Sequence, residues 1–173
     1  MEDMDALVLR STRDWLQAAH LVVLATVVRT WGSSPRPVGA MMALRGDGHV
    51  VGSVSGGCIE DDLIQRYSGA NRAGAVAGRP TELRRYGVTA DEAHRFGLPC
   101  GGTLELLLEF APDLAAMDAL VARLEGGELV ARTVHCADGT VSLASAGAEG
   151  EADVLQFDGH TMRNVLGPAW RML

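Results

Sequence analysis

The sequence is poor in cysteine and contains no long apolar run. Its 173 residues include three cysteines, Cys58, Cys100 and Cys136. They are too few for the disulfide framework of a small secreted domain, and they form no Cys-x-x-Cys pair of the zinc or redox type. The longest apolar run, residues 21–28 interrupted by Thr26, is far shorter than the roughly 20 residues of a membrane-spanning helix. We therefore expect free thiols, a reducing compartment and no membrane span.

An excess of basic residues is also lacking. The formal net charge is -7, and phosphate backbones and anionic lipid attract basic surfaces. The first five residues, Met-Glu-Asp-Met-Asp, do not provide the basic region and apolar stretch of a secretory signal. These features argue against nucleic acid as a partner and favour a cytoplasmic location.

Motifs for metal and nucleotide binding are absent as well. The histidines form no His-x-x-x-His pair, so we expect no metal site. Gly46 and Gly48 lack the full Gly-x-Gly-x-x-Gly spacing and open no helix, and no P-loop pattern occurs. A Ser-His-Asp set cannot be argued from residue order alone, so no catalytic residue is assigned.

Hydrophobic periodicity and turn residues predict a mixture of helices, strands and hairpins. Helices are expected at residues 5–20, from about Cys58 to Tyr67, and from Pro112 to Gly126. Strands are expected at 21–28, 41–44, 49–54, 83–86, 103–110, 130–135, 140–143 and 154–157. Residues 71–80 fit either a loop or a poorly patterned helix. Because hairpins are frequent and strict alternation is absent, we predict one α+β domain over residues 1–173, with a mixed, largely antiparallel sheet and flanking helices.

Two glycine-flanked cysteines are the first candidates for chemistry. Cys58 follows Gly56 and Gly57 at the expected start of a helix, where the helix dipole favours a thiolate and backbone N–H groups can cradle an anion. The acidic residues 60–62 oppose an anion at this place. A tight turn holding a small buried cysteine is the alternative.

The second of these cysteines, Cys100, precedes Gly101 and Gly102 in the mirrored order. If the two thiols meet, they suit a soft ligand such as sulfur, copper(I) or a molybdenum dithiolene. Two packing cysteines that never meet remain the alternative.

The loop at residues 32–39 is stiffened by two prolines. It offers the hydroxyl groups of Ser33 and Ser34 and the guanidinium of Arg36, a set that suits a phosphate or pyrophosphate. The alternative is a rigid connector whose arginine pairs with a surface carboxylate.

Three ordered motifs together resemble the XdhC/CoxI family. They are residues 26–42, with Trp31-Gly32-Ser33-Ser34-Pro35-Arg36-Pro37 at their centre, Gly52-Ser53-Val54-Ser55-Gly56-Gly57-Cys58-Ile59-Glu60, and Gly97-Leu98-Pro99-Cys100-Gly101-Gly102-Thr103. The likeness extends over about residues 15–143. Many members carry a second, Rossmann-like domain after this one; we expect none here and a separate partner in its place.

The resemblance implies an accessory factor, with no catalytic turnover implied. Proteins of this family bind the molybdenum cofactor, molybdopterin, transiently. They support its sulfuration with a cysteine desulfurase and pass it to the apo-subunit of a molybdenum hydroxylase such as xanthine dehydrogenase or carbon monoxide dehydrogenase. The implied cofactor contacts are Cys58, Cys100, Gly56, Gly57, Gly101 and Gly102, with the loop of Ser33, Ser34 and Arg36 at the pterin phosphate.

Two other classes of protein stay open. A sulfurtransferase would carry a persulfide on Cys58 or Cys100, and a scaffold for hydroxylase assembly would bind no pterin. A homodimer, the identity of the client and the mononucleotide or dinucleotide form of the cofactor are equally open.

Overall fold

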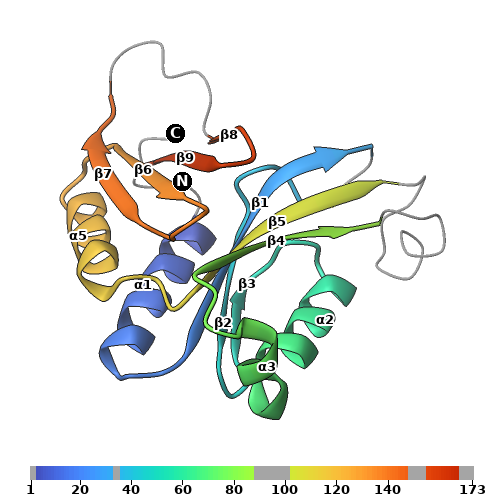
Figure 1. The fold of residues 1–173 in the computed structure, drawn as a ribbon. Coiled ribbons are helices and arrows are strands. Elements are labelled where there is room, and N and C mark those ends of the chain that lie inside the picture. Colours follow the sequence, from blue (N-terminus) through green and yellow to red (C-terminus); the bar gives the residue numbers. More distant parts are fainter. Residues whose placement is uncertain (1–2, 33–35, 88–101, 148–154, 168–173) are drawn as a thin grey trace.

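The computed structural model describes residues 3–32, 36–87, 102–147 and 155–167. Within these residues two antiparallel sheets are flanked by helices (Figure 1). Sheet A holds five strands in the order β3-β2-β1-β5-β4, and sheet B holds four in the order β7-β6-β9-β8. The predicted α+β class with antiparallel pairing and flanking helices is confirmed. The strands, which we expected in one sheet, are divided between two.

The elements have the following bounds. The helices are α1 (Asp3–Gln17), α2 (Cys58–Tyr67), the 3-10 turn η1 (Gly69–Asn71), α3 (Arg72–Val76) and α5 (Leu114–Glu125). Sheet A consists of β1 (Val22–Trp31), β2 (Met41–Arg45), β3 (Val50–Gly52), β4 (Thr81–Tyr86) and β5 (Thr103–Phe110). Sheet B consists of β6 (Val130–His135), β7 (Val141–Ser145), β8 (Leu155–Phe157) and β9 (Thr161–Leu166). Over the described residues, no helix has the length and apolarity to span a bilayer.

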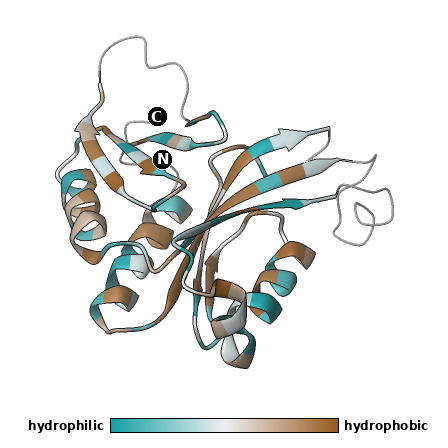
Figure 2. Ribbon diagram, in the orientation of Figure 1, coloured by the Kyte–Doolittle hydropathy of each residue, from teal (hydrophilic) through white to brown (hydrophobic). Residues whose placement is uncertain are grey.

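Sheet A is covered on both faces, and β1 runs through its middle. One face packs on α2 and α3 through Ala25, Met42 and Ile59, among others. The other face packs on α1, α5 and sheet B through a second cluster that includes Leu24 and Leu120. Residues 22–28 are therefore all buried, which is why this segment is apolar at successive positions. Figure 2 shows the same arrangement as a hydrophobic middle of the sheet beneath the helices.

The strand registers bring several chain connections to one end of sheet A, here called the Trp31 end. Trp31 pairs with Thr103, and Tyr86 pairs with Leu104. Gly52, the last residue of β3, pairs with Met42 near the start of β2. The connections that follow β1 and β4 therefore begin at the Trp31 end, and the connection that follows β3 leaves the sheet in the same direction from the level of Ala25.

The last strand was not predicted from the sequence. We expected the final strand at residues 154–157, whereas β9 follows at Thr161–Leu166 and pairs with both β8 and β6. The Asp158-Gly159 pair between β8 and β9 is the same hairpin signal that the two earlier hairpins carry. Met162, Asn164 and Leu166 are buried in alternation, and the polar Asn164 interrupts the apolar pattern.

A buried ion pair links the two sheets. Arg132 of β6 donates two hydrogen bonds to Glu109 of β5, at 2.6 and 3.0 Å. The two side chains are only 5% and 4% exposed. Each charge is therefore desolvated and depends on the other for compensation.

We expect Arg132→Met to lower the free energy of unfolding by about 3–5 kcal/mol, because it leaves the Glu109 carboxylate buried without its partner. Arg10→Met is the matched control: it removes an Arg–Glu125 pair whose side chains are 51% and 47% exposed, and should cost less than about 1 kcal/mol. Urea denaturation at neutral pH measures both. Equal losses in the two variants would contradict a special role for the buried pair.

Candidate functional site

The turn between β3 and α2 is organised by the carboxylate of Glu60. One carboxylate oxygen accepts hydrogen bonds from the backbone N–H groups of Val54 and Ser55, at 2.8 and 2.7 Å. The other accepts from the N–H of Gly57 at 2.7 Å and from the Ser55 hydroxyl at 2.6 Å. Glu60 thus takes the N–H groups that a phosphate at this turn would need.

The hydrogen bonds decide the protonation of Glu60. Burial acts to raise the pKa of its carboxyl group, but the hydrogen bonds from Ser55 and Val54 outweigh burial, and the pKa lies below its ordinary value. The group is therefore a charged anchor for the turn at neutral pH. The spacing Gly57-x-x-Glu60 is the glutamate half of a capping box and signals this role in the sequence.

Cys58 is the first residue of α2, and its side chain is exposed. The preceding Gly56 has a φ of +86°, a backbone conformation that side chains disfavour. A Cβ added at Gly56 or Gly57 would meet no atom within 4 Å, so the space beside the cysteine is open. The turn therefore presents a thiol at a helix N-terminus with room for a ligand to approach.

The first and third motifs also come together at the Trp31 end. Gly32 has a φ of +71°, and a Cβ there would lie 3.2 Å from the Cα of Gly102. Gly102 is buried against it, next to the pairing of Trp31 with Thr103. This close approach of two backbones explains a glycine at both positions.

The remaining predicted site residues are placed only in part. Arg36 is half-buried in the connection from β1 to β2, where the Gly39 N–H donates to the carbonyl of Val27 at 2.8 Å. Ser33, Ser34, Cys100 and Gly101 lie outside the described residues. The structure thus brings Gly56, Gly57, Cys58, Arg36 and Gly102 to one end of sheet A.

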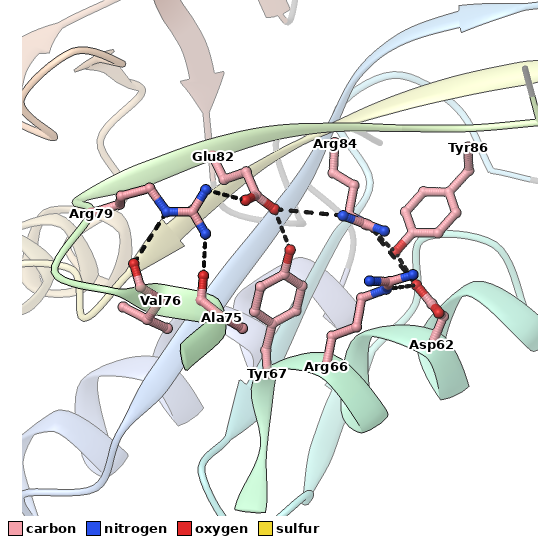
Figure 3. A network of polar contacts seen from close by, with 9 residues as sticks. All are labelled: Asp62, Arg66, Tyr67, Ala75, Val76, Arg79, Glu82, Arg84 and Tyr86. Carbon is pink, nitrogen blue, oxygen red and sulfur yellow. Dashed lines mark hydrogen bonds and ion pairs between the residues drawn. The ribbon is translucent and has the colours of Figure 1, made fainter. Parts of the chain in front are cut away.

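Starting at Asp62, one helical turn after Cys58, a polar network joins α2 to β4 (Figure 3). Asp62 accepts hydrogen bonds from the Tyr86 hydroxyl at 2.6 Å and from the Nε of Arg66 at 2.9 Å. Glu82 accepts from the Tyr67 hydroxyl and, at 2.5 Å, from Arg79. The sequence alone did not reveal this network, since its members are spread over residues 62–86.

The network borders a pocket of about 520 Å³ between α2, α3 and β4. Burial and the hydrogen bond to Glu82 raise the pKa of Tyr67 to about 12. Burial and Asp62 likewise raise the pKa of Tyr86. Both tyrosines therefore keep their protons at neutral pH and donate to the carboxylates.

Comparisons with known proteins place part of the chain in a family. The sequence model described as the XdhC and CoxI family matches residues 15–87. Residues 15–87 belong to the XdhC and CoxI family. This part contains the loop of Arg36, the Glu60 turn, Cys58 and the network of α2 and β4, and the family resemblance is confirmed.

Two curated relatives match longer or closely similar parts of the chain. The chain is 35% identical over 118 residues to the molybdenum cofactor insertion chaperone PaoD of Escherichia coli, covering 68% of this chain and 35% of that protein. It is 48% identical over 53 residues to a Bacillus subtilis protein named as a probable xanthine dehydrogenase subunit, covering 31% of this chain and 16% of that protein. The chain therefore spans about a third of the first relative's length and less of the second's.

A solved structure shares the fold. The crystal structure of a xanthine dehydrogenase from Bacillus halodurans superposes with a TM-score of 0.66 at 24% sequence identity. The match covers 97% of this chain and 53% of that chain. At this identity the likeness concerns the fold.

We expect Glu60→Gln to lower the free energy of unfolding by about 2 kcal/mol at pH 7, because one amide oxygen replaces two charged acceptors among buried donors. The folded-state pKa of Glu60 is depressed. Its stabilisation is therefore complete above the unfolded value of about 4.3 and is lost as the pH falls through the folded value. Denaturant titrations from pH 7 to pH 3 should show the difference between the two proteins shrinking. A difference that stays constant over this range would contradict the charged anchor.

Alkylation should separate the two described thiols. Cys136 is partly buried, and burial, Glu109 and Asp158 raise its pKa. In a Cys100→Ser background at pH 7, we expect iodoacetamide to modify Cys58 at least about tenfold faster than Cys136. Peptide mass spectrometry over time measures both rates, and equal rates would count against an accessible Cys58.

Proposed function

We propose that this XdhC/CoxI protein is an accessory factor that binds the molybdenum cofactor and assists its insertion into a molybdenum hydroxylase. The observation that carries the proposal is the match to the molybdenum cofactor insertion chaperone over 118 residues at 35% identity. The exposed thiol of Cys58 beside an open glycine turn supports it. Binding the cofactor and passing it to a client require an accessible ligating group such as this thiol. They require no catalytic residues.

The chemistry of the Trp31 end fits this cofactor. A thiolate suits a soft metal centre such as the dithiolene-bound molybdenum, and Cys58 is the described thiol at this end. Gly56 and Gly57 leave space for a bulky ligand. Cys100, Gly101, Ser33 and Ser34 stay predicted contacts from the sequence.

The finer parts of the proposal concern partners and chemistry. We propose that the clients are apo-subunits of xanthine dehydrogenase or carbon monoxide dehydrogenase type. Sulfuration of the bound cofactor would need a cysteine desulfurase, and a separate Rossmann-domain protein is a further proposed partner. The proposed site of action is the cytoplasm, where thiols stay reduced.

Co-expression with an active molybdopterin pathway tests the proposal. We expect the purified wild-type protein to carry pterin, measured by fluorescence after oxidative release, and Cys58→Ser to lose most of it because the thiolate ligand is gone. Cys136→Ser is the matched control, since this cysteine directly follows β6 of sheet B, where its N–H donates to the carbonyl of His160. It should retain wild-type pterin.

Other outcomes separate the alternatives. Equal pterin content in the wild type, Cys58→Ser and Cys100→Ser would remove the cysteines as ligands. Co-purification with a hydroxylase subunit without any pterin would point to a scaffold instead.

A further inference from the structure

The pocket between α2, α3 and β4 lies on the same side of α2 as Cys58. Cys58, Asp62 and Arg66 are spaced four residues apart, so they follow one stripe of the helix. Asp62 and Arg66 line the pocket. At a rise of about 1.5 Å per residue, the Arg66 backbone lies roughly 12 Å along the helix from that of Cys58.

The pocket is locally basic in an acidic protein. Its lining carries three arginines, Arg66, Arg79 and Arg84, and two carboxylates, Asp62 and Glu82, whereas the whole chain has a charge of -7. Both carboxylates already accept a tyrosine hydroxyl. Asp62 also pairs with Arg66 and Glu82 with Arg79, so the third arginine gives the lining its net positive charge.

Two of these arginines have terminal nitrogens that donate no hydrogen bond to another described residue. Arg66 bonds to Asp62 through its Nε alone, so among the described residues its two terminal nitrogens donate to no group. Arg84 donates from its Nε to the Tyr86 hydroxyl at 3.0 Å. It also forms two ion pairs beyond hydrogen-bond distance, from Nε to Asp62 at 4.0 Å and from Nη1 to Glu82 at 3.9 Å. Figure 3 shows both guanidinium groups in the gap between α2 and β4.

We propose that this pocket binds the phosphate group of a phosphate ester or diphosphate. Two guanidinium groups with open terminal nitrogens match the oxygens of a tetrahedral anion, and about 520 Å³ falls within the range of small-molecule sites. The anion cradle at the start of α2 is filled by Glu60, so it offers no competing place. The identity of the whole ligand rests on the proposed function: it is the phosphate end of the cofactor whose sulfur end contacts Cys58.

Inorganic pyrophosphate is a direct probe, titrated calorimetrically into the purified full chain at low ionic strength. We expect saturable binding to the wild type and about tenfold weaker binding to Arg66→Gln and to Arg84→Gln, since each loses charge-assisted hydrogen bonds. Arg10→Gln is the matched control, because Arg10 bonds to Glu125 through its Nε and is 51% exposed, against 48% for Arg66. Arg10→Gln should bind as the wild type does, and circular dichroism verifies that each variant is folded.

Three results would contradict phosphate binding in this pocket. They are no saturable pyrophosphate binding to the wild type, equal weakening of that binding by Arg10→Gln, or its loss in Arg36→Gln but not in Arg66→Gln. The pterin assay keeps the two proposals apart. Pyrophosphate binding that depends on Arg66 and Arg84 in a protein that never carries pterin would support the pocket and refute the cofactor. If the protein retains pterin but neither Arg66→Gln nor Arg84→Gln weakens pyrophosphate binding, cofactor binding is supported and the phosphate site in the pocket is refuted.

Discussion

The candidate site depends on one carboxylate, that of Glu60. By accepting the backbone N–H groups of residues 54, 55 and 57, it fixes the path from the edge strand β3 into α2. That path sets where the first turn of α2 begins and leaves the Cys58 side chain exposed. It also fixes the rotation of α2, so that Asp62 meets Tyr86 of β4. A neutral or shorter side chain at this position would hold both the Cys58 thiol and the polar network less firmly in place.

The rest of the fold provides a rigid frame for this turn. Sheet A is held between helices on one face and helices plus sheet B on the other, and the Glu109–Arg132 pair joins the sheets. The connections at the Trp31 end can therefore carry glycines and polar groups without being needed for the core. This separation of a packed frame from a functional end is common where loops carry the chemistry.

The sequence predicted elements better than it predicted their surroundings. Strands with an Asp-Gly turn or a continuous apolar run were found, as β1 and the β2–β3 hairpin show, because these signals are local. The face of α1 was predicted only in part. Of the periodic positions Met4, Leu7 and Val8, only Val8 is buried, together with Leu9, while Met4 and Leu7 are 44% and 48% exposed. A second helix and a sheet edge decide which stripe is covered. The family motifs located the glycine turns. The acidic residues 60–62 were expected to oppose an anion at the second turn, and Glu60 does so by accepting the backbone N–H groups itself.

The polar network shows why the net charge of a chain does not decide whether it can bind a small phosphate ligand. A charge of -7 argues against long phosphate backbones, because such partners sense the field of the whole surface. A single phosphate group senses the few groups within hydrogen-bond distance. Between α2 and β4, the tyrosines hold the carboxylates and leave arginine donors facing the pocket. The two statements are compatible: an acidic protein can exclude nucleic acid and still bind a small phosphate ester, provided that some arginine donors in the pocket are not used by its carboxylates.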